Sequence, residues 1–449
     1  MTMGAAMTAS GRRRLSPEDL RILALENKTV AGHTCKVILL RGQVDLERLR
    51  SSIADRLSRS PLLSVRLGEI DGAPSWVPDQ HVDISAHVRV SDQVPDQVTM
   101  LDEAGLRAVV AGIFEKHLDR SRPLWRIDAI PRLTGGASAL VWRIHHALAD
   151  GSTAMRMATS VLWDEQSDGG PDAAGTGVPR RRPGPATTPR QPESVAHRRL
   201  AGLRAAAREA PHPWMRSPFD GHIDGRRAVA FTSTGLAELH QAAGAACGAT
   251  VNDAVLTIVA GGLRRWLEAR HGHLGPVRVK VPVSLHGLPH EPGDSADGRG
   301  NHDSFFCLDL PLTSADPLDR LASIHRATRA RKRDHDAQHL DSVMRELAAI
   351  PPLSDFAERV LAHPRSFALN VSNVPGPPQS VRVLGMPVHA MYSLAEIGEH
   401  HALRIAVVSL GGTLHFGFVA DPTLLPDVSD LAADVQAEAA ALITARPSA

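Results

Sequence analysis

Along the first 163 residues, short apolar runs alternate with segments whose apolar residues recur at helical spacing. Residues 35–40 and 139–146 carry apolar side chains continuously or at every second position, which predicts two strands. Residues 45–59 place leucine and isoleucine every three or four positions, and residues 152–163 also favour a helix. This mixture predicts an α/β fold rather than a helical bundle.

The pattern breaks between about residues 164 and 192, where proline, glycine and polar residues replace almost all apolar ones. Such a composition cannot bury enough surface to fold alone, so it predicts a linker. Residues 194–210 favour a basic helix, either a solvated part of the linker or a surface helix attracted to anionic lipid. We therefore divide the chain into a first domain at residues 1–163, a linker at 164–215 and a second domain at 216–449.

Regular patterns resume in the second domain. Thr250 is a good N-cap for the apolar helix that follows it, and residues 277–284 alternate like a strand. Residues 403–410 and 413–420 are two strand-like runs separated by a Gly-Gly pair, which is a strong hairpin signal. No period of about 20 to 50 residues is present, which argues against a repeat array.

The composition narrows the class of protein. The chain has 449 residues, of which 43% are hydrophobic, enough for a sizeable core and more than one folded unit. Lysine and arginine number 50 and aspartate and glutamate 49, for a net charge of +1. This balance argues against a dedicated nucleic-acid-binding protein, which usually carries a strong basic excess.

The cysteines and the apolar stretches predict the compartment. Cys35, Cys247 and Cys307 are far apart and form no C-x-x-C pair, so we expect neither a disulfide framework nor a structural zinc site. We expect each of them to be a buried or half-buried thiol in a reducing cytoplasm. No signal peptide is evident, and the longest nearly apolar stretch, residues 254–263, is about half of a membrane-spanning helix. The sequence predicts a cytoplasmic protein, either soluble or peripheral on a membrane.

The segment HHALADG, which begins at His145, concentrates the residues suited to catalysis. If the strand predicted at residues 139–146 persists to its end, His146 faces one side of it and His145 the other. A neutral imidazole, with an ordinary pKa of about 6.5, suits removal of a proton from a hydroxyl near neutral pH. Asp150 can either orient a histidine or fix the loop through an arginine. Gly151 removes bulk beside the imidazole and allows backbone conformations closed to other residues.

Other motifs of catalysis are missing from the sequence. A second HHAL at residues 400–403 lacks the Asp-Gly pair, so we expect it to be a surface or core feature. No G-x-S-x-G elbow and no cysteine in a reactive context is present, so covalent catalysis has no candidate nucleophile. HExxH, paired CxxC, P-loop and GxGxxG motifs are also absent, so we expect no metal and no bound cofactor.

HHALADG resembles the active-site motif of the chloramphenicol-acetyltransferase-like and condensation-domain superfamily. Four further segments resemble motifs of its wax ester synthase/acyl-CoA:diacylglycerol acyltransferase branch, in that family's order: Pro123-Leu124-Trp125 (PLW), Asn252-Asp253 (ND), Gly300-Asn301 (the GN region) and Ser372–Pro377 (SNVPGP). With them the resemblance covers the chain from about Leu15 to Asp421.

The resemblance implies an α/β fold of two chloramphenicol-acetyltransferase-like domains with the active site in a tunnel at their interface. It implies direct transfer of a long-chain acyl group from acyl-CoA, a co-substrate, to diacylglycerol or a fatty alcohol, as in triacylglycerol or wax ester synthesis. By motif position, His146 would be the general base and His145 the partner that faces away. Asp150 and Gly151 would shape the loop, and Asn252 would polarise the thioester carbonyl or position the acceptor.

Two departures from the family's pattern concern the acceptor. Asp220 stands where the family's LNG motif has asparagine, although Arg226 and Arg227 are kept, and Ser409–Gly412 lacks the tyrosine of the family's Ser-Tyr-x-Gly. They leave open an enzyme of the same fold that acts on a specialised metabolite or uses a carrier-bound acyl donor. A third hypothesis is a non-catalytic relative that binds acyl chains at a membrane or lipid droplet, which the intact HHALADG disfavours.

Overall fold

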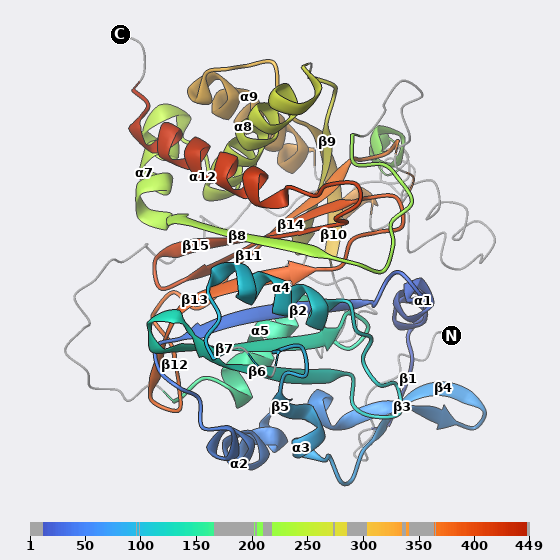
Figure 1. The fold of residues 1–449 in the computed structure, drawn as a ribbon. Helices are drawn as coiled ribbons and strands as arrows, with labels where there is room; N and C mark the ends of the chain where they lie inside the picture. The colour runs from blue at the N-terminus through green and yellow to red at the C-terminus, as the bar shows by residue number, and fades with distance from the viewer. Residues whose placement is uncertain are drawn as a thin grey trace, which may run out of the picture.

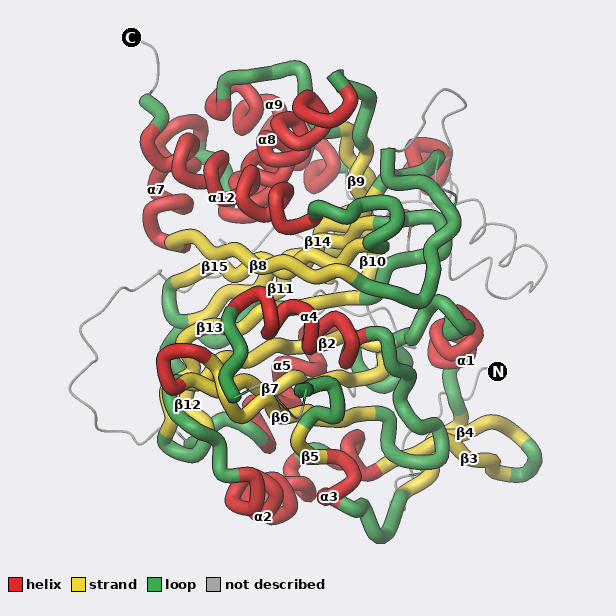
Figure 2. Tube along the Cα trace, viewed as in Figure 1, coloured by secondary structure: helices red, strands yellow, loops and turns green. Residues whose placement is uncertain are grey.

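The computed structural model of the chain describes residues 12–95, 97, 99–165, 202, 204–209, 218–272, 274–284, 303–334, 338–340, 363 and 365–446. In this part of the chain, two six-stranded sheets lie one above the other, each accompanied by helices (Figure 1). A smaller three-stranded sheet extends from the lower, N-terminal half. Figure 2 shows the strands of the two large sheets side by side across the middle of the molecule.

The N-terminal sheet has the strand order β12-β13-β2-β7-β6-β5. Its strands are β2 (His33–Leu40), β5 (Val88–Val90), β6 (Trp125–Leu133), β7 (Ala137–His145), β12 (Arg382–Val383) and β13 (Met386–Ala395). All neighbours are antiparallel except β5 and β6. Because β12 and β13 follow most of the C-terminal half in sequence, the chain returns late to complete the N-terminal sheet.

Helices and a small sheet surround this N-terminal sheet. The helices are α1 (Pro17–Leu25), α2 (Leu46–Arg56), α3 (Ile84–His87), α4 (Glu103–Phe114) and α5 (Gly151–Val161), with short 3-10 turns at Leu57–Arg59, Pro61–Ser64 and Thr134–Gly136. The small sheet has the order β1-β4-β3, with β1 (Arg13–Arg14), β3 (Val65–Ile70) and β4 (Ala73–Pro78). The buried face of α4 belongs to the hydrophobic core of the C-terminal half, so α4 helps to join the two halves.

The C-terminal sheet has the strand order β10-β9-β11-β14-β15-β8. Its strands are β8 (Ala228–Gly235), β9 (Arg278–Ser284), β10 (Asp303–Asp309), β11 (Leu369–Val374), β14 (Leu403–Leu410) and β15 (Thr413–Ala420). Only β11 pairs in parallel, with β9 and β14. Four helices cover the side away from the N-terminal half (Figure 1): α7 (Leu236–Cys247), α8 (Val251–His271), α9 (Pro317–Arg333) and α12 (Val428–Thr444).

Local signals in the sequence explain where several elements begin and end. Ser16 and Thr250 start α1 and α8, each in a capping box in which the residue three positions on returns the hydrogen bond. The hairpin of β14 and β15 turns at Gly411 and Gly412, whose φ angles of 53° and 86° favour glycine. Strand β7 ends at His145, one residue before the predicted end. The predicted α/β class and these elements are confirmed.

Other predictions fall partly outside the described residues. Residues 166–201, which hold most of the predicted linker, lie outside them, and only residues 202 and 204–209 of the predicted basic helix are described. Cys35 and Cys307 are buried, but the prediction was wrong for Cys247, which is exposed at the end of α7. No single described helix is long and apolar enough to cross a membrane, although α7 and α8, bent by 96°, pass that test as a pair.

Candidate active site

The HHALADG segment forms the loop that leaves the N-terminal sheet and enters α5. His145 is the last residue of β7 and is buried, whereas His146 lies in the loop and is half-buried. The backbone N–H of His146 donates to the carbonyl oxygen of Gly32 at 2.9 Å, and that of His145 donates to Leu124 at 2.9 Å. The backbone of both histidines is therefore held by neighbouring chain segments.

His145 is fixed by hydrogen bonds at both ring nitrogens. Its Nδ1 accepts from the backbone N–H of Ala147 at 3.1 Å, so its Nε2 carries the proton toward Oε2 of Glu26, also 3.1 Å away. Arg120 donates to the same carboxylate at 2.7 Å. Burial raises the pKa of Glu26, but the hydrogen bonds from His145 and Arg120 outweigh it and leave the pKa below its ordinary value. Glu26 is therefore a charged partner that orients His145.

His146 is neutral over the whole physiological pH range. Burial is the larger cause and the positive charge of Arg404 on β14 is the next, and together they lower its pKa to about 4. A neutral imidazole keeps a lone pair with which it can accept a proton. The group that the sequence singled out as a base thus has the protonation state that a base requires.

Asp150 fixes the loop by capping the helix behind it. Its Oδ1 accepts from the backbone N–H of Thr153 at 2.6 Å and from the hydroxyl of Ser152 at 2.9 Å, and the side chain is almost completely buried. Of the two roles left open for this residue, the structure supports fixing the loop, although the partner is a helix N-terminus and not an arginine.

Two glycines let the C-terminal half approach the loop closely. A Cβ on Gly151 would lie 3.1 Å from Cγ2 of Val374, the last residue of β11 and part of SNVPGP. A Cβ on Gly376 would lie 2.1 Å from the carbonyl oxygen of Ser409, whose hydroxyl accepts from the Gly376 N–H at 3.1 Å. SNVPGP therefore joins β14 to the HHALADG loop.

The other predicted positions include two with structural contacts, Asp253 and Trp125. Asn252 is the second residue of α8, and its proposed part in catalysis stays a prediction. Asp253 completes the cap of α8 and binds Thr328 and His325 at 2.6 and 2.9 Å. Trp125 of PLW is buried and donates from Nε1 to a backbone carbonyl. Gly300 and Asn301 lie outside the described residues.

The second histidine pair is structural. His401 is buried and stacks on Phe367 with the ring centroids 4.0 Å apart. His400 faces Asp220, with Nδ1 and Oδ1 separated by 3.5 Å. Asp220, which replaces the expected asparagine, is thus engaged with a histidine outside HHALADG.

Two features bear on metal binding and on covalent catalysis by Cys35 among the described side chains. No group of three or more histidine, cysteine, aspartate or glutamate residues could hold a metal ion there. Burial raises the pKa of Cys35 to about 12, so this thiol stays protonated and is a poor nucleophile. The sequence pattern did not predict that Glu26, Gly32 and Arg404 belong to the site, because none of them lies in a motif and each is far from HHALADG in the sequence.

Two stacked α/β halves, meeting around a neutral histidine of an HHxxxDG loop, define a protein of the chloramphenicol-acetyltransferase-like class. Residues 15–255 match the model of the wax ester synthase/diacylglycerol acyltransferase catalytic domain, and residues 299–442 match that of the WS/DGAT C-terminal domain. The chain belongs to this family and is an acyltransferase.

Individual relatives agree over almost the whole chain. A Mycobacterium tuberculosis protein that carries a diacylglycerol O-acyltransferase name is 28% identical and matches 94% of this chain and 95% of its own length. The solved wax ester synthase/diacylglycerol acyltransferase of Marinobacter aquaeolei VT8 has a TM-score of 0.67 at 24% identity, over 96% of this chain and 98% of its own. The first condensation domain of the CDA synthetase shares the fold, with a TM-score of 0.58 at 16% identity over 97% of both chains.

Proposed function

We propose that the protein transfers a long-chain acyl group from acyl-CoA to the hydroxyl of diacylglycerol or a long-chain alcohol, with His146 as the general base. The observation that carries this proposal is the neutral, half-buried imidazole of His146 at the point where the two halves meet. The family supports the reaction class, since its members are acyltransferases that form esters from alcohols.

The reaction follows from a base without a nucleophile. Nε2 or Nδ1 of His146 removes the proton of the acceptor hydroxyl as its oxygen attacks the thioester carbonyl. The tetrahedral intermediate then collapses, the carbon–sulfur bond breaks, and the imidazolium returns the proton to the leaving thiolate. The products are an ester and free CoA, and His146 ends in the neutral form in which it began.

A continuous thiol assay tests the proposed role of His146. Purified protein is incubated with palmitoyl-CoA and either diacylglycerol or hexadecanol, and free thiol is followed together with the ester product. His146→Ala should lower kcat by about 10²- to 10⁴-fold, the usual contribution of general base catalysis. His400→Ala, from the HHAL that lacks Asp-Gly, is the matched control and should retain activity. Equal rates of ester formation by wild type and His146→Ala would refute the role of the base.

The acceptor is the second question that this assay answers. The Asp220 and hairpin departures motivate an alternative in which the same fold acylates a specialised metabolite or uses a carrier-bound donor. Turnover of diacylglycerol or hexadecanol at micromolar concentrations, at a rate comparable to that of known lipid synthases, would rule this alternative out. Thiol release without any ester product, or none with either acceptor, would favour it, and mass spectrometry of products from a lipid extract would then identify the acceptor.

Two finer proposals accompany the reaction. Acceptors of this kind dissolve in lipid, so we propose peripheral attachment to a membrane or lipid droplet, tested by sedimentation with anionic and with neutral phospholipid vesicles. Equal absence from both vesicle pellets would contradict it.

For Asn252, we propose a part in positioning the acceptor, and Asn252→Ala should then raise KM for the acceptor without changing KM for acyl-CoA.

A further inference from the structure

The segment between α1 and β2, residues 26–32, is the support of the histidine pair. At one end, the Glu26 carboxylate binds Nε2 of His145, and at the other, the Gly32 carbonyl accepts the backbone N–H of His146. Gly32 has a φ of +68°, and a Cβ there would lie 2.7 Å from Nε2 of His145. This segment therefore touches both histidines and has no room to shift toward them.

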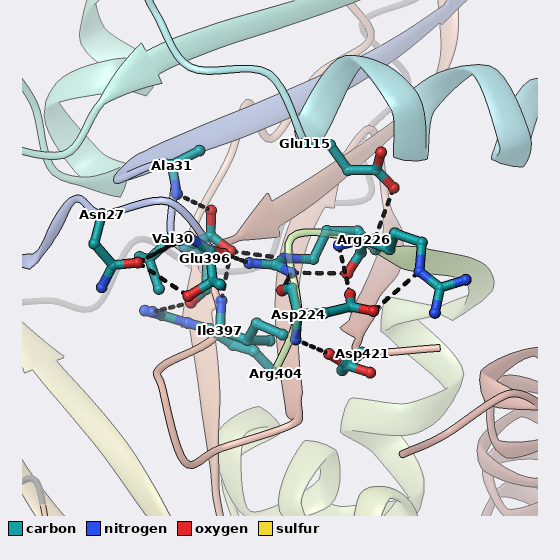
Figure 3. A network of polar contacts seen from close by, with 12 residues as sticks. Asn27, Val30, Ala31, Glu115, Asp224, Arg226, Glu396, Ile397, Arg404 and Asp421 are labelled. Carbon is teal, nitrogen blue, oxygen red and sulfur yellow. Dashed lines mark hydrogen bonds and ion pairs between the residues drawn. The ribbon is translucent and has the colours of Figure 1, made fainter. Parts of the chain in front are cut away.

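Side chains from the C-terminal half of the chain hold this support in place (Figure 3). Glu396, directly after β13, accepts the backbone N–H of Ala31 at 3.0 Å through Oε2. Its Oε1 accepts from Nε of Arg227 at 2.9 Å, and Arg227 also donates to the backbone carbonyl of Thr29. Both members of this ion pair are buried, so it is shielded from the screening that weakens surface pairs.

Further contacts tie the same pair to the two halves. The backbone N–H of Arg227 donates to the Glu115 carboxylate, directly after α4, at 2.8 Å. Nη1 of Arg404 donates to the backbone carbonyl of Glu396 at 2.9 Å. A continuous series of hydrogen bonds thus leads from β14 through Glu396 and Ala31 to the residue that holds His146.

We infer that Arg227 and Glu396 are positioning residues: through them the C-terminal half holds residues 26–32 and so fixes His145 and His146 for catalysis. This inference rests on the proposed role of His146 as the base. Glu396 and Arg227 bind backbone groups of the support, at Ala31 and Thr29, so their effect is exerted through that backbone. Loss of the pair should misplace the base without removing it, and displacements of about 1 Å in such geometry cost on the order of 100-fold in rate.

The test uses conservative and disruptive variants in the full-length chain. Arg227→Lys and Glu396→Gln keep most of the volume, whereas Arg227→Met removes the ion pair outright. The matched control is Arg320→Met, which breaks another buried ion pair, with Glu438, between α9 and α12 on the far side of the C-terminal sheet. For each variant, kcat, KM for palmitoyl-CoA, the pH profile of kcat/KM and the melting temperature are measured.

A positioning role predicts a pattern that loss of stability alone cannot produce. Arg227→Met and Glu396→Gln should lower kcat by about 10- to 100-fold, with KM for palmitoyl-CoA within twofold of wild type. The acid limb of kcat/KM should move to higher pH as His146 becomes more hydrated. Arg227→Lys should recover part of kcat, and Arg320→Met should lower the melting temperature without changing kcat or the limb.

Two results would overturn the inference. One is wild-type kcat and an unmoved acid limb in folded Glu396→Gln and Arg227→Met. The other is a loss of kcat in Arg227→Met that Arg320→Met reproduces at an equal drop in melting temperature. Failure of the proposed function is distinguishable, because then His146→Ala itself would turn over at the wild-type rate.

Discussion

The charge of Arg404, together with burial, should set the pH at which the enzyme loses activity. His146 has a pKa of about 4, for which burial is the larger cause and the Arg404 guanidinium the next. About one molecule in a thousand is then protonated at pH 7, and about one in ten at pH 5. We therefore expect kcat/KM of the wild type to be nearly constant from pH 8 to pH 5 and to fall by half near pH 4.

Replacing Arg404 with methionine removes the charge and keeps most of the apolar contacts. Two unit charges roughly 6 to 12 Å apart, in an effective dielectric of about 20, repel each other by about 1 to 3 kcal/mol. Part of that energy is recovered by water in the variant, so we expect the pKa of His146 to rise by about one unit, since one unit corresponds to about 1.4 kcal/mol. The ratio of kcat/KM at pH 5 to that at pH 7 should fall from about 0.9 to about 0.5.

Initial rates of thiol release, with folding checked by circular dichroism at each pH, measure this ratio. Arg404→Lys keeps the charge and is the control, and its acid limb should stay close to that of the wild type even if its kcat is lower. An unmoved limb in Arg404→Met would refute the electrostatic argument. So would an equal shift in both variants, because that would trace the effect to lost hydrogen bonds.

Three further outcomes follow from the same geometry. Gly376→Ala should give little folded protein, because its Cβ would lie 2.1 Å from the Ser409 carbonyl oxygen, as a thermal melt would show. Gly32→Ala should lose about 1 to 3 kcal/mol in urea unfolding and also lower kcat, since φ there is +68° and His145 is in contact. Between pH 6.5 and 4, His146 binds more protons in the unfolded state than in the native state. The free energy of unfolding should therefore decrease as the pH is lowered through this range, by at most about 3 kcal/mol. His146→Gln should remove this part of the pH dependence.

The elements and the catalytic loop could be predicted because their signals are local. Thr250 precedes a helix with a favourable acid three residues on, and the Gly-Gly pair specifies the hairpin of β14 and β15. The cap formed by Asp150 was also predictable, since this aspartate lies two residues before the predicted start of the helix and aspartate is a preferred N-cap.

The rest of the site could not be predicted because its residues meet across long stretches of sequence. Glu26 is 119 positions from His145, and Glu396 is 365 positions from Ala31. The periodicity of apolar residues predicts which face of a strand is buried but not which strand lies beside it. The pairing of β13 with β2 therefore could not be predicted from one sequence. Tertiary pairing, and not local preference, brings these charges to the histidines.

Under the proposed function, the low pKa of His146 weakens it as a base, and the neighbouring charge of Arg404 can compensate for this during the reaction. A base with a pKa of about 4 accepts a proton less readily than an ordinary imidazole does, so burial and Arg404 together weaken the base before substrate binds. During attack, however, the thioester oxygen gains negative charge, and a nearby cation lowers the free energy of that charge in a buried site. Under the proposed function, we expect the cation that disfavours a free imidazolium to favour a transition state in which imidazolium and oxyanion form together. An effect that disfavours the free imidazolium but favours the imidazolium–oxyanion pair acts on the transition state. Such an effect accelerates the chemical step and does not merely strengthen substrate binding.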